Sequence, residues 1–121
     1  MTSLNETLAR YGAAWRESDP DTRLAHLAAC FAETGRYVDP SADVTGRDVL
    51  SDHIGKVLAE FGGRVDLTSA PQQHHGMIHF TWHMVAGDGT VMIAGRDFAR
   101  LNAQGQIAEL VGFFGEPEAL G

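Results

Sequence analysis

Two aspartates stand in contexts that suggest proton-transfer chemistry inside one apolar cavity. Asp39 ends the extended stretch Arg36-Tyr-Val-Asp-Pro40, and Asp97 lies in the middle of the strand-like segment from Val91 to Phe98. A carboxylate among apolar strand residues is costly unless it is paired or used. Such groups usually have shifted pKa values, and acid–base chemistry is commonly found at them. We therefore take Asp39 and Asp97 as candidate catalytic residues.

Each of these aspartates also has a simpler interpretation. Asp39 precedes a proline, where an aspartate can serve only to form a solvent-exposed turn. Asp97 would be neutral, hydrogen-bonded or paired with a histidine if it is buried, or it could form an ion pair that only fixes the sheet. We expect the buried position, because Asp97 shares its strand parity with small or apolar residues, namely Ile93, Gly95, Ala99 and Leu101.

Three helices are predicted in the first half of the chain. Ser3 and Glu6 form a capping box, and the apolar spacing that follows predicts a helix as far as Trp15. Asp19 and Pro20 predict the start of a second helix, which we expect to end at Thr34-Gly35. A brief strand at residues 36–39 stops at Pro40, and a loop to Gly46 leads to a third helix over residues 47–61.

The period of the apolar residues changes from 3.6 to 2 after Gly62-Gly63, which predicts strands. We expect strands over residues 64–69, then up to Val85, over 90–101 and over 106–114, with hairpins at 87–89 and 102–105. Helices grouped early and a meander late indicate an α+β fold. The sequence thus predicts one domain over residues 1–121, with three N-terminal helices packed on a strongly curved, mainly antiparallel sheet that forms a conical pocket.

Composition excludes several classes of function. The 121 residues carry a net charge of −7 without a cluster of Lys or Arg, which disfavours nucleic acid and anionic membranes as partners. The single cysteine, Cys30, cannot form an internal disulfide, and no signal peptide or membrane-spanning run is evident, so we expect a cytoplasmic protein. No nucleotide-binding motif or metal-ligand spacing is found, and we expect neither a cofactor nor a metal.

The order of elements and several motifs resemble the nuclear-transport-factor-type cone fold, in its SnoaL-like and ketosteroid-isomerase-like branch. The motifs that carry the resemblance are Arg10-Tyr-Gly-Ala-Ala-Trp15, Cys30 to Pro40, Gly95-Arg-Asp-Phe98, and the run from Leu101 to Glu116. The resemblance implies a base at Asp39 and an oxyanion site formed by Tyr11 and Asp97. Tyr11 also lies on the apolar face of its helix, where most tyrosines are core residues.

The remaining candidates are residues expected to line the pocket. Apolar walls are expected to exclude water, and His53 is either a surface residue or part of the pocket roof. Strand parity places His74 on the inner face, although a bulge at Gly76 would give that place to His75. The full set of pocket candidates comprises Trp15, Tyr37, His53, Leu67, His74, His75, Phe80, Trp82 and Phe114.

These residues predict a cofactor-independent isomerase or cyclase-type enzyme in which a carboxylate moves a proton on a small hydrophobic carbonyl compound. Two alternatives stay open: a non-catalytic module for ligand binding or dimerisation, and a hydrolase or dehydratase that uses a dyad of Asp97 with His74 or His75. Phe98 and Phe113 on the outer sheet face predict a homodimer through that face.

Overall fold

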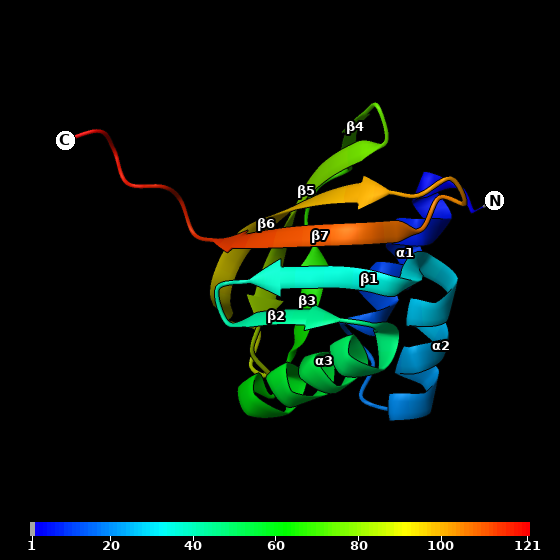
Figure 1. The fold of residues 1–121 in the computed structure, drawn as a ribbon. Helices are drawn as coiled ribbons and strands as arrows, with labels where there is room; N and C mark the ends of the chain where they lie inside the picture. Colours follow the sequence, from blue (N-terminus) through cyan, green and yellow to red (C-terminus); the bar gives the residue numbers. More distant parts are fainter. Residues whose placement is uncertain (1) are drawn as a thin grey trace.

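Two short helices at the start of the chain pack against each other (Figure 1). In the computed structural model, which describes residues 2–121, α1 (Leu4–Ala14) begins at Ser3, whose hydroxyl accepts a hydrogen bond from the Glu6 backbone N–H at 3.2 Å. α2 (Pro20–Cys30) begins at Asp19, whose carboxylate accepts the Thr22 backbone N–H at 2.9 Å. Both helix starts are as the sequence predicts.

The second helix ends earlier than predicted, because its last expected turn belongs to the sheet. β1 (Phe31–Asp39) starts directly after Cys30, and Phe31 pairs with Ile107 in the core. The ring of Phe31 lies so close to Gly35 that a side chain at Gly35 would overlap it. Long-range pairing and burial of Phe31 therefore override the local helical preference of residues 31–34.

The predicted loop after Pro40 contains a further strand. β2 (Ala42–Thr45) pairs with β1 in antiparallel register, with Tyr37 opposite Val44 and Asp39 opposite Ala42. α3 (Arg47–Phe61) follows, as predicted, and ends at Gly62, whose φ of 65° is the left-handed conformation that a glycine adopts readily.

The second half of the chain is a meander of strands. These are β3 (Arg64–Leu67), β4 (Gln72–His74), β5 (Met77–Val85), β6 (Val91–Leu101) and β7 (Ile107–Phe114). Together with β1 and β2, they form one seven-stranded sheet in the order β2-β1-β7-β6-β5-β3, with β4 paired to β5 at its end. All pairs are antiparallel except β1 with β7, so the sheet is mixed rather than purely antiparallel.

The sheet curls without closing, and the three helices cover its inner face (Figure 1). Alternate residues of β5 lie in the core, as the period-2 pattern predicts: Ile78, Phe80, Trp82 and Met84 are all buried. The outer face keeps Phe98 and Phe113 exposed. The predicted α+β class with helices packed on a curved sheet is thus confirmed. No helix within residues 2–121 is long and apolar enough to span a membrane.

Candidate functional site

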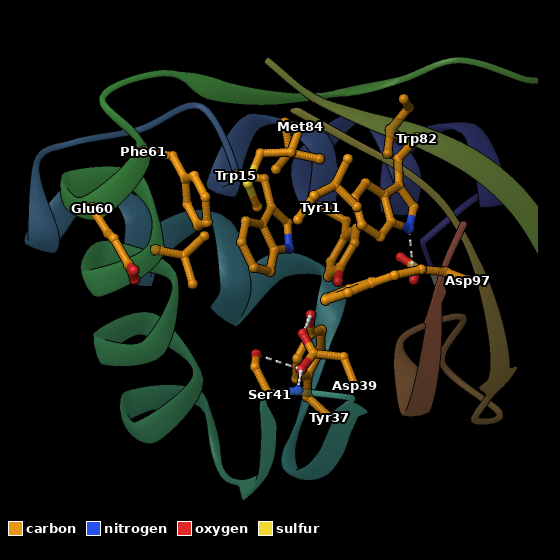
Figure 2. Close-up of a pocket in the computed structure, with 15 residues that line it drawn as sticks. Tyr11, Trp15, Tyr37, Asp39, Ser41, Glu60, Phe61, Trp82, Met84 and Asp97 are labelled. Carbon is orange, nitrogen blue, oxygen red and sulfur yellow. Dashed lines mark hydrogen bonds between the residues drawn. The ribbon is translucent and has the colours of Figure 1, made fainter. Parts of the chain in front are cut away.

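A cavity of about 220 Å³ lies between the inner face of the sheet and helices α1 and α3 (Figure 2). It is smaller than the ~300–1,000 Å³ that is typical for drug-sized ligands, so it suits a small molecule. Aromatic and aliphatic side chains make most of its wall. The lining residues are Tyr11, Trp15, Tyr37, Asp39, Ser41, Val57, Glu60, Phe61, Val65, Leu67, Trp82, Met84, Ile93, Asp97 and Phe114.

Asp39 and Asp97 face this cavity from strands that are two apart in the sheet. β7 lies between them, with Gly112 directly opposite Asp97 and with Val111, the preceding residue, opposite Val38. A Cβ atom at Gly112 would lie 2.8 Å from Asp97 Oδ1 and 3.5 Å from the Asp39 Cβ. The missing side chain at Gly112 therefore lets the Asp97 carboxyl group lie directly against β7, beside Asp39.

Asp97 is held by a single hydrogen-bond donor. The indole Nε1–H of Trp82 donates to Asp97 Oδ1 at 3.0 Å, and only 5% of the aspartate is exposed. Burial raises the pKa of Asp97 to about 7; the negative charge of Asp39 adds to this rise and the Trp82 hydrogen bond opposes it. Gly95, which pairs with Trp82, makes this contact possible because any Cβ there would overlap the indole ring.

Asp39, in contrast to Asp97, is surrounded by several groups that stabilise its ionised form. The Tyr37 hydroxyl donates to its Oδ2 at 2.5 Å, while the backbone N–H and the hydroxyl of Ser41 both donate to Oδ1 at 2.7 Å. His53 Nε2 lies 3.8 Å from Oδ2, which is an ion-pair distance and too long for a hydrogen bond. Burial acts to raise the pKa of Asp39, but interactions with His53, Tyr37 and Ser41 outweigh it and lower the pKa to about 2.

Two buried side-chain polar atoms within residues 2–121 lack a hydrogen-bond partner, and both belong to this region: the Tyr11 hydroxyl and His53 Nε2. The Tyr11 residue is 1% exposed and lines the cavity. Burial, together with the nearby Asp97, raises the pKa of Tyr11 well above its ordinary value, so the phenol keeps its proton. Since buried polar groups normally have partners, an unused phenolic O–H in a cavity wall is available to a ligand.

Eight of the candidates proposed from the sequence line the cavity together. They are Tyr11, Trp15, Tyr37, Asp39, Leu67, Trp82, Asp97 and Phe114. Phe80 lies outside the lining, fully buried with its ring edge-on to that of Tyr11 at 6.2 Å between centroids. His53 also lies outside the lining. It lies next to Asp39 and packs against the rings of Trp15 and Tyr37.

The two adjacent histidines do not reach the site, and the predicted inner-face position of His74 or His75 is wrong. β4 ends at His74, and the positive φ angles of His75 and Gly76 (50° and 74°) turn the chain into β5. The strand parity that we extended from β5 back to residue 74 is broken by this turn. Both histidines are exposed, and the structure therefore holds no Asp97–histidine dyad with His74 or His75.

Several lining residues were not among the sequence candidates. Val57, Phe61, Val65, Met84 and Ile93 lie on inward faces of α3, β3, β5 and β6, and periodicity alone does not distinguish a pocket wall from the core. Ser41 follows Asp39-Pro40, a context typical of a turn in which an aspartate caps nearby N–H groups. Glu60 carries no sequence signal, because a polar residue near a helix end is usually solvated. Within residues 2–121, no group of three or more His, Cys, Asp or Glu residues is placed to hold a metal ion.

The fold agrees with the comparisons to known proteins. Residues 8–110 match the model of the SnoaL-like domain family, and the chain belongs to this family. A crystal structure of a candidate isomerase of the SnoaL-like family from Agrobacterium tumefaciens is 32% identical, with a TM-score of 0.85, and the match covers 96% of this chain and 100% of that one. No curated protein matches this chain.

More distant structures show the same fold. A protein of unknown function with a cystatin-like fold from Methylobium petroleophilum is 15% identical, with a TM-score of 0.77 and coverage of 98% of this chain and 79% of that one. An NTF2-like protein of unknown function from Cytophaga hutchinsonii is 11% identical, with a TM-score of 0.68 and coverage of 95% and 92%. The chain thus has the NTF2-like fold, and the resemblance inferred from its motifs is confirmed.

The opposite pKa shifts predict opposite effects of pH on stability. Asp97 has a higher pKa in the folded state than in the unfolded chain, so it lowers stability increasingly as pH rises from about 4 to about 7. Asp39 has a lower pKa in the folded state, so its stabilising contribution is present above about pH 4 and is lost toward pH 2.

We expect Asp97→Asn to remove the loss of stability that Asp97 causes as the pH rises. The free energy of unfolding of the variant, relative to the wild type, should rise by about 2–3 kcal/mol between pH 5 and pH 8. Urea denaturation at the two pH values measures this difference. A difference that does not change with pH would show that Asp97 titrates normally.

Proposed function

We propose that this protein is a cofactor-independent isomerase or cyclase-type enzyme that moves a proton on a small hydrophobic carbonyl compound. The observation that carries the proposal is the pair of carboxyl groups with divergent pKa values, about 2 for Asp39 and about 7 for Asp97, facing one apolar cavity across Gly112. Two carboxyl groups whose environments separate their pKa values in this way are suited to the roles of base and acid.

In the proposed reaction, Asp39 takes a proton from the carbon next to the substrate carbonyl. The electrons of the broken C–H bond form a carbon–carbon double bond, and the carbonyl electrons move onto the oxygen. The Tyr11 hydroxyl and the protonated Asp97 donate hydrogen bonds to that oxygen as its negative charge develops. Protonated Asp39 then returns the proton to a different carbon of the enolate, which completes an isomerisation. In a cyclisation, the enolate carbon instead attacks a second carbonyl carbon of the same molecule, and protonated Asp39 gives its proton to the alkoxide oxygen that this bond leaves.

Burial, with a smaller contribution from the charge of Asp39, keeps both donors in the protonated form that they need. The charge of Asp39 contributes to the raised pKa values of Asp97 and Tyr11, because a nearby anion disfavours a second negative charge. When Asp39 accepts the proton, its charge passes to the substrate oxygen, and the cavity gains no net charge. Preorganised neutral donors in an apolar site stabilise such an oxyanion more than water does.

The low pKa of Asp39 limits its strength as a base in the empty cavity. A ligand that fills the cavity beside this carboxylate, whose side chain is 4% exposed, excludes the remaining water from the anion and raises its basicity. The same low pKa favours the alternative of a ligand-binding module, in which Asp39 is a permanent anionic contact and no proton moves. The two functions differ in one observable, the exchange of α-protons of a bound ketone.

Isosteric substitutions separate the roles of the two aspartates. With 4-isobutylcyclohexanone in D₂O, we expect Asp39→Asn to lower the enzyme-dependent α-proton exchange by at least about 10²-fold, because the base is lost. Asp97→Asn should keep activity within about tenfold, since the amide can accept from Trp82 and still donate to the oxyanion. Proton NMR measures the exchange. Exchange that survives Asp39→Asn would overturn the assignment of the base, and a wild type that binds the ketone without exchange would favour the binding module.

The pH dependence gives a second test of the same assignment. The exchange rate of the wild type should fall above about pH 7, where Asp97 ionises and stops donating, and should stay level down to well below pH 5, since Asp39 remains ionised there. Asp97→Asn should abolish the alkaline decline while leaving the acidic side unchanged. An alkaline decline that persists in Asp97→Asn would assign it to another group.

We also propose that two copies of the chain pair through the outer sheet face. The exposed rings of Phe98 and Phe113 lie 6.1 Å apart, with the Arg96 guanidinium 5.7 Å above the Phe113 ring. Arg36 and Glu109, 3.6 Å apart, lie on the same face, so a two-fold-related copy can set positive against negative charge around an apolar centre.

Phe98→Glu should therefore convert a dimer to a monomer without unfolding it, since Phe98 is 46% exposed in the single chain. Analytical ultracentrifugation measures the mass of both proteins, and circular dichroism monitors the fold. A wild type that sediments as a monomer at about 100 µM would contradict the proposed pairing, because stable interfaces of this kind persist at such concentrations.

A further inference from the structure

Every lining residue of the cavity that can carry a full charge near neutral pH is acidic. Asp39, Glu60 and Asp97 are acidic, two tyrosines complete the set, and no Lys, Arg or His is among the lining residues. A cavity with walls of low dielectric constant and one sign of charge concentrates its field and selects ligands by charge. Anionic carbonyl compounds, such as keto acids and phosphate esters, therefore meet repulsion in this cavity.

Glu60 provides the free negative charge at the mouth of the cavity. Within residues 2–121 its side chain forms no hydrogen bond and no ion pair. It lies in the last turn of α3, which contains no basic residue, so the partial negative charge of the helix C-terminus adds to that of the carboxylate. An acidic residue at this end of a helix is unfavourable on its own, and a bound cation would relieve the repulsion.

The end of the cavity near Asp97 and Tyr11 offers hydrogen-bond donors to a ligand. Figure 2 shows Glu60 at one end of the lining set and Asp97 at the other, with Trp15 and Tyr11 between them. The buried Tyr11 hydroxyl has no partner and lines the cavity, which independently indicates a polar ligand atom at that end. Between the ends, the faces of Trp15 and Phe61 provide apolar contact and can attract a cation through their π-electrons.

We propose that the substrate is a carbonyl compound that also carries a positively charged nitrogen, and that Glu60 binds this charge at the cavity mouth while the carbonyl oxygen meets Tyr11 and Asp97. This inference rests on the proposed function, because it uses the oxyanion site to orient the ligand. Asp39 is a poorer partner for the cation, since its oxygens already accept hydrogen bonds from Tyr37 and Ser41. Glu60 acts as a specificity-determining residue and takes no part in the transfer of the proton.

Three cyclohexanones with matched substituents at carbon 4 test the inference. The substituents are (dimethylamino)methyl, isobutyl and carboxymethyl, which have the same number of non-hydrogen atoms but are cationic, neutral and anionic at pH 7. We expect the cationic ketone to bind at least about tenfold more tightly than the anionic one, with a difference that shrinks in 0.5 M salt because the mouth is exposed. NMR titration measures the three dissociation constants.

Glu60→Gln removes the charge with little change in shape. The cationic ketone should lose about three- to tenfold in affinity, the neutral ketone should be unaffected, and the anionic ketone should bind more tightly. Asp48→Asn is the matched control, since it removes the same charge from the same helix about 18 Å away, beyond the ~10 Å screening length. The control should leave the ratio of affinities unchanged.

Three results would overturn the inference: equal binding of the cationic and anionic ketones to the wild type, an unchanged ratio in Glu60→Gln, or no detectable binding of any of the three. The proposed function is judged separately, by the exchange of α-protons in the neutral isobutyl ketone, which carries no charge for Glu60 to bind. Exchange of that ketone without charge selection would leave the enzyme assignment standing and remove only the substrate class.

Discussion

The unequal hydrogen bonding of two buried carboxyl groups in one cavity is the constraint on which the rest of the site depends. Asp97 is buried and accepts one hydrogen bond, from the Trp82 indole. Asp39 accepts three hydrogen bonds, from Tyr37 and Ser41, and lies 3.8 Å from His53. Their charges are also coupled, since the anion at Asp39 contributes to the raised pKa of Asp97. A protein that buried both groups with as few donors as Asp97 has would have to neutralise both or lose stability, and neither outcome leaves a base beside an acid.

The fold sustains this asymmetry through positions where a side chain is absent. The absence of a Cβ at Gly112 lets the Asp97 carboxyl group lie against β7, and Gly95 lets the indole of Trp82 lie across β6 and reach Asp97. The curl of the sheet then brings β1 and β6 to face α1 and α3 across the cavity (Figure 2). A strand glycine usually weakens a sheet, but a Cβ at either position would collide with a side chain of the site, namely Asp97 at Gly112 and Trp82 at Gly95.

Much of the fold could be predicted from the sequence because its signals are local. The N-caps at Ser3 and Asp19 and the alternation along β5 require only neighbouring residues to be recognised. The end of α2 could not be predicted this way, because Phe31 enters the sheet through its pairing with Ile107, far along the chain. Among the site residues, the buried position of Asp97 could be predicted by strand parity. The position of His74 could not, because the turn at His75-Gly76 interrupts the parity between residue 74 and β5. Glu60 could not be predicted at all, because its place at the cavity mouth depends on how α3 packs against the sheet.

A titration of the side-chain carboxyl carbons of Asp39 and Asp97 by ¹³C NMR tests the central claim most directly. The two signals can be assigned by their loss in Asp39→Asn and Asp97→Asn. The account predicts that one carboxyl group titrates at about pH 2 and the other at about pH 7. Two titrations that both fall near the ordinary aspartate value of about 3.9 would contradict it, because the cavity would then hold two similar, ionised carboxylates and no acid.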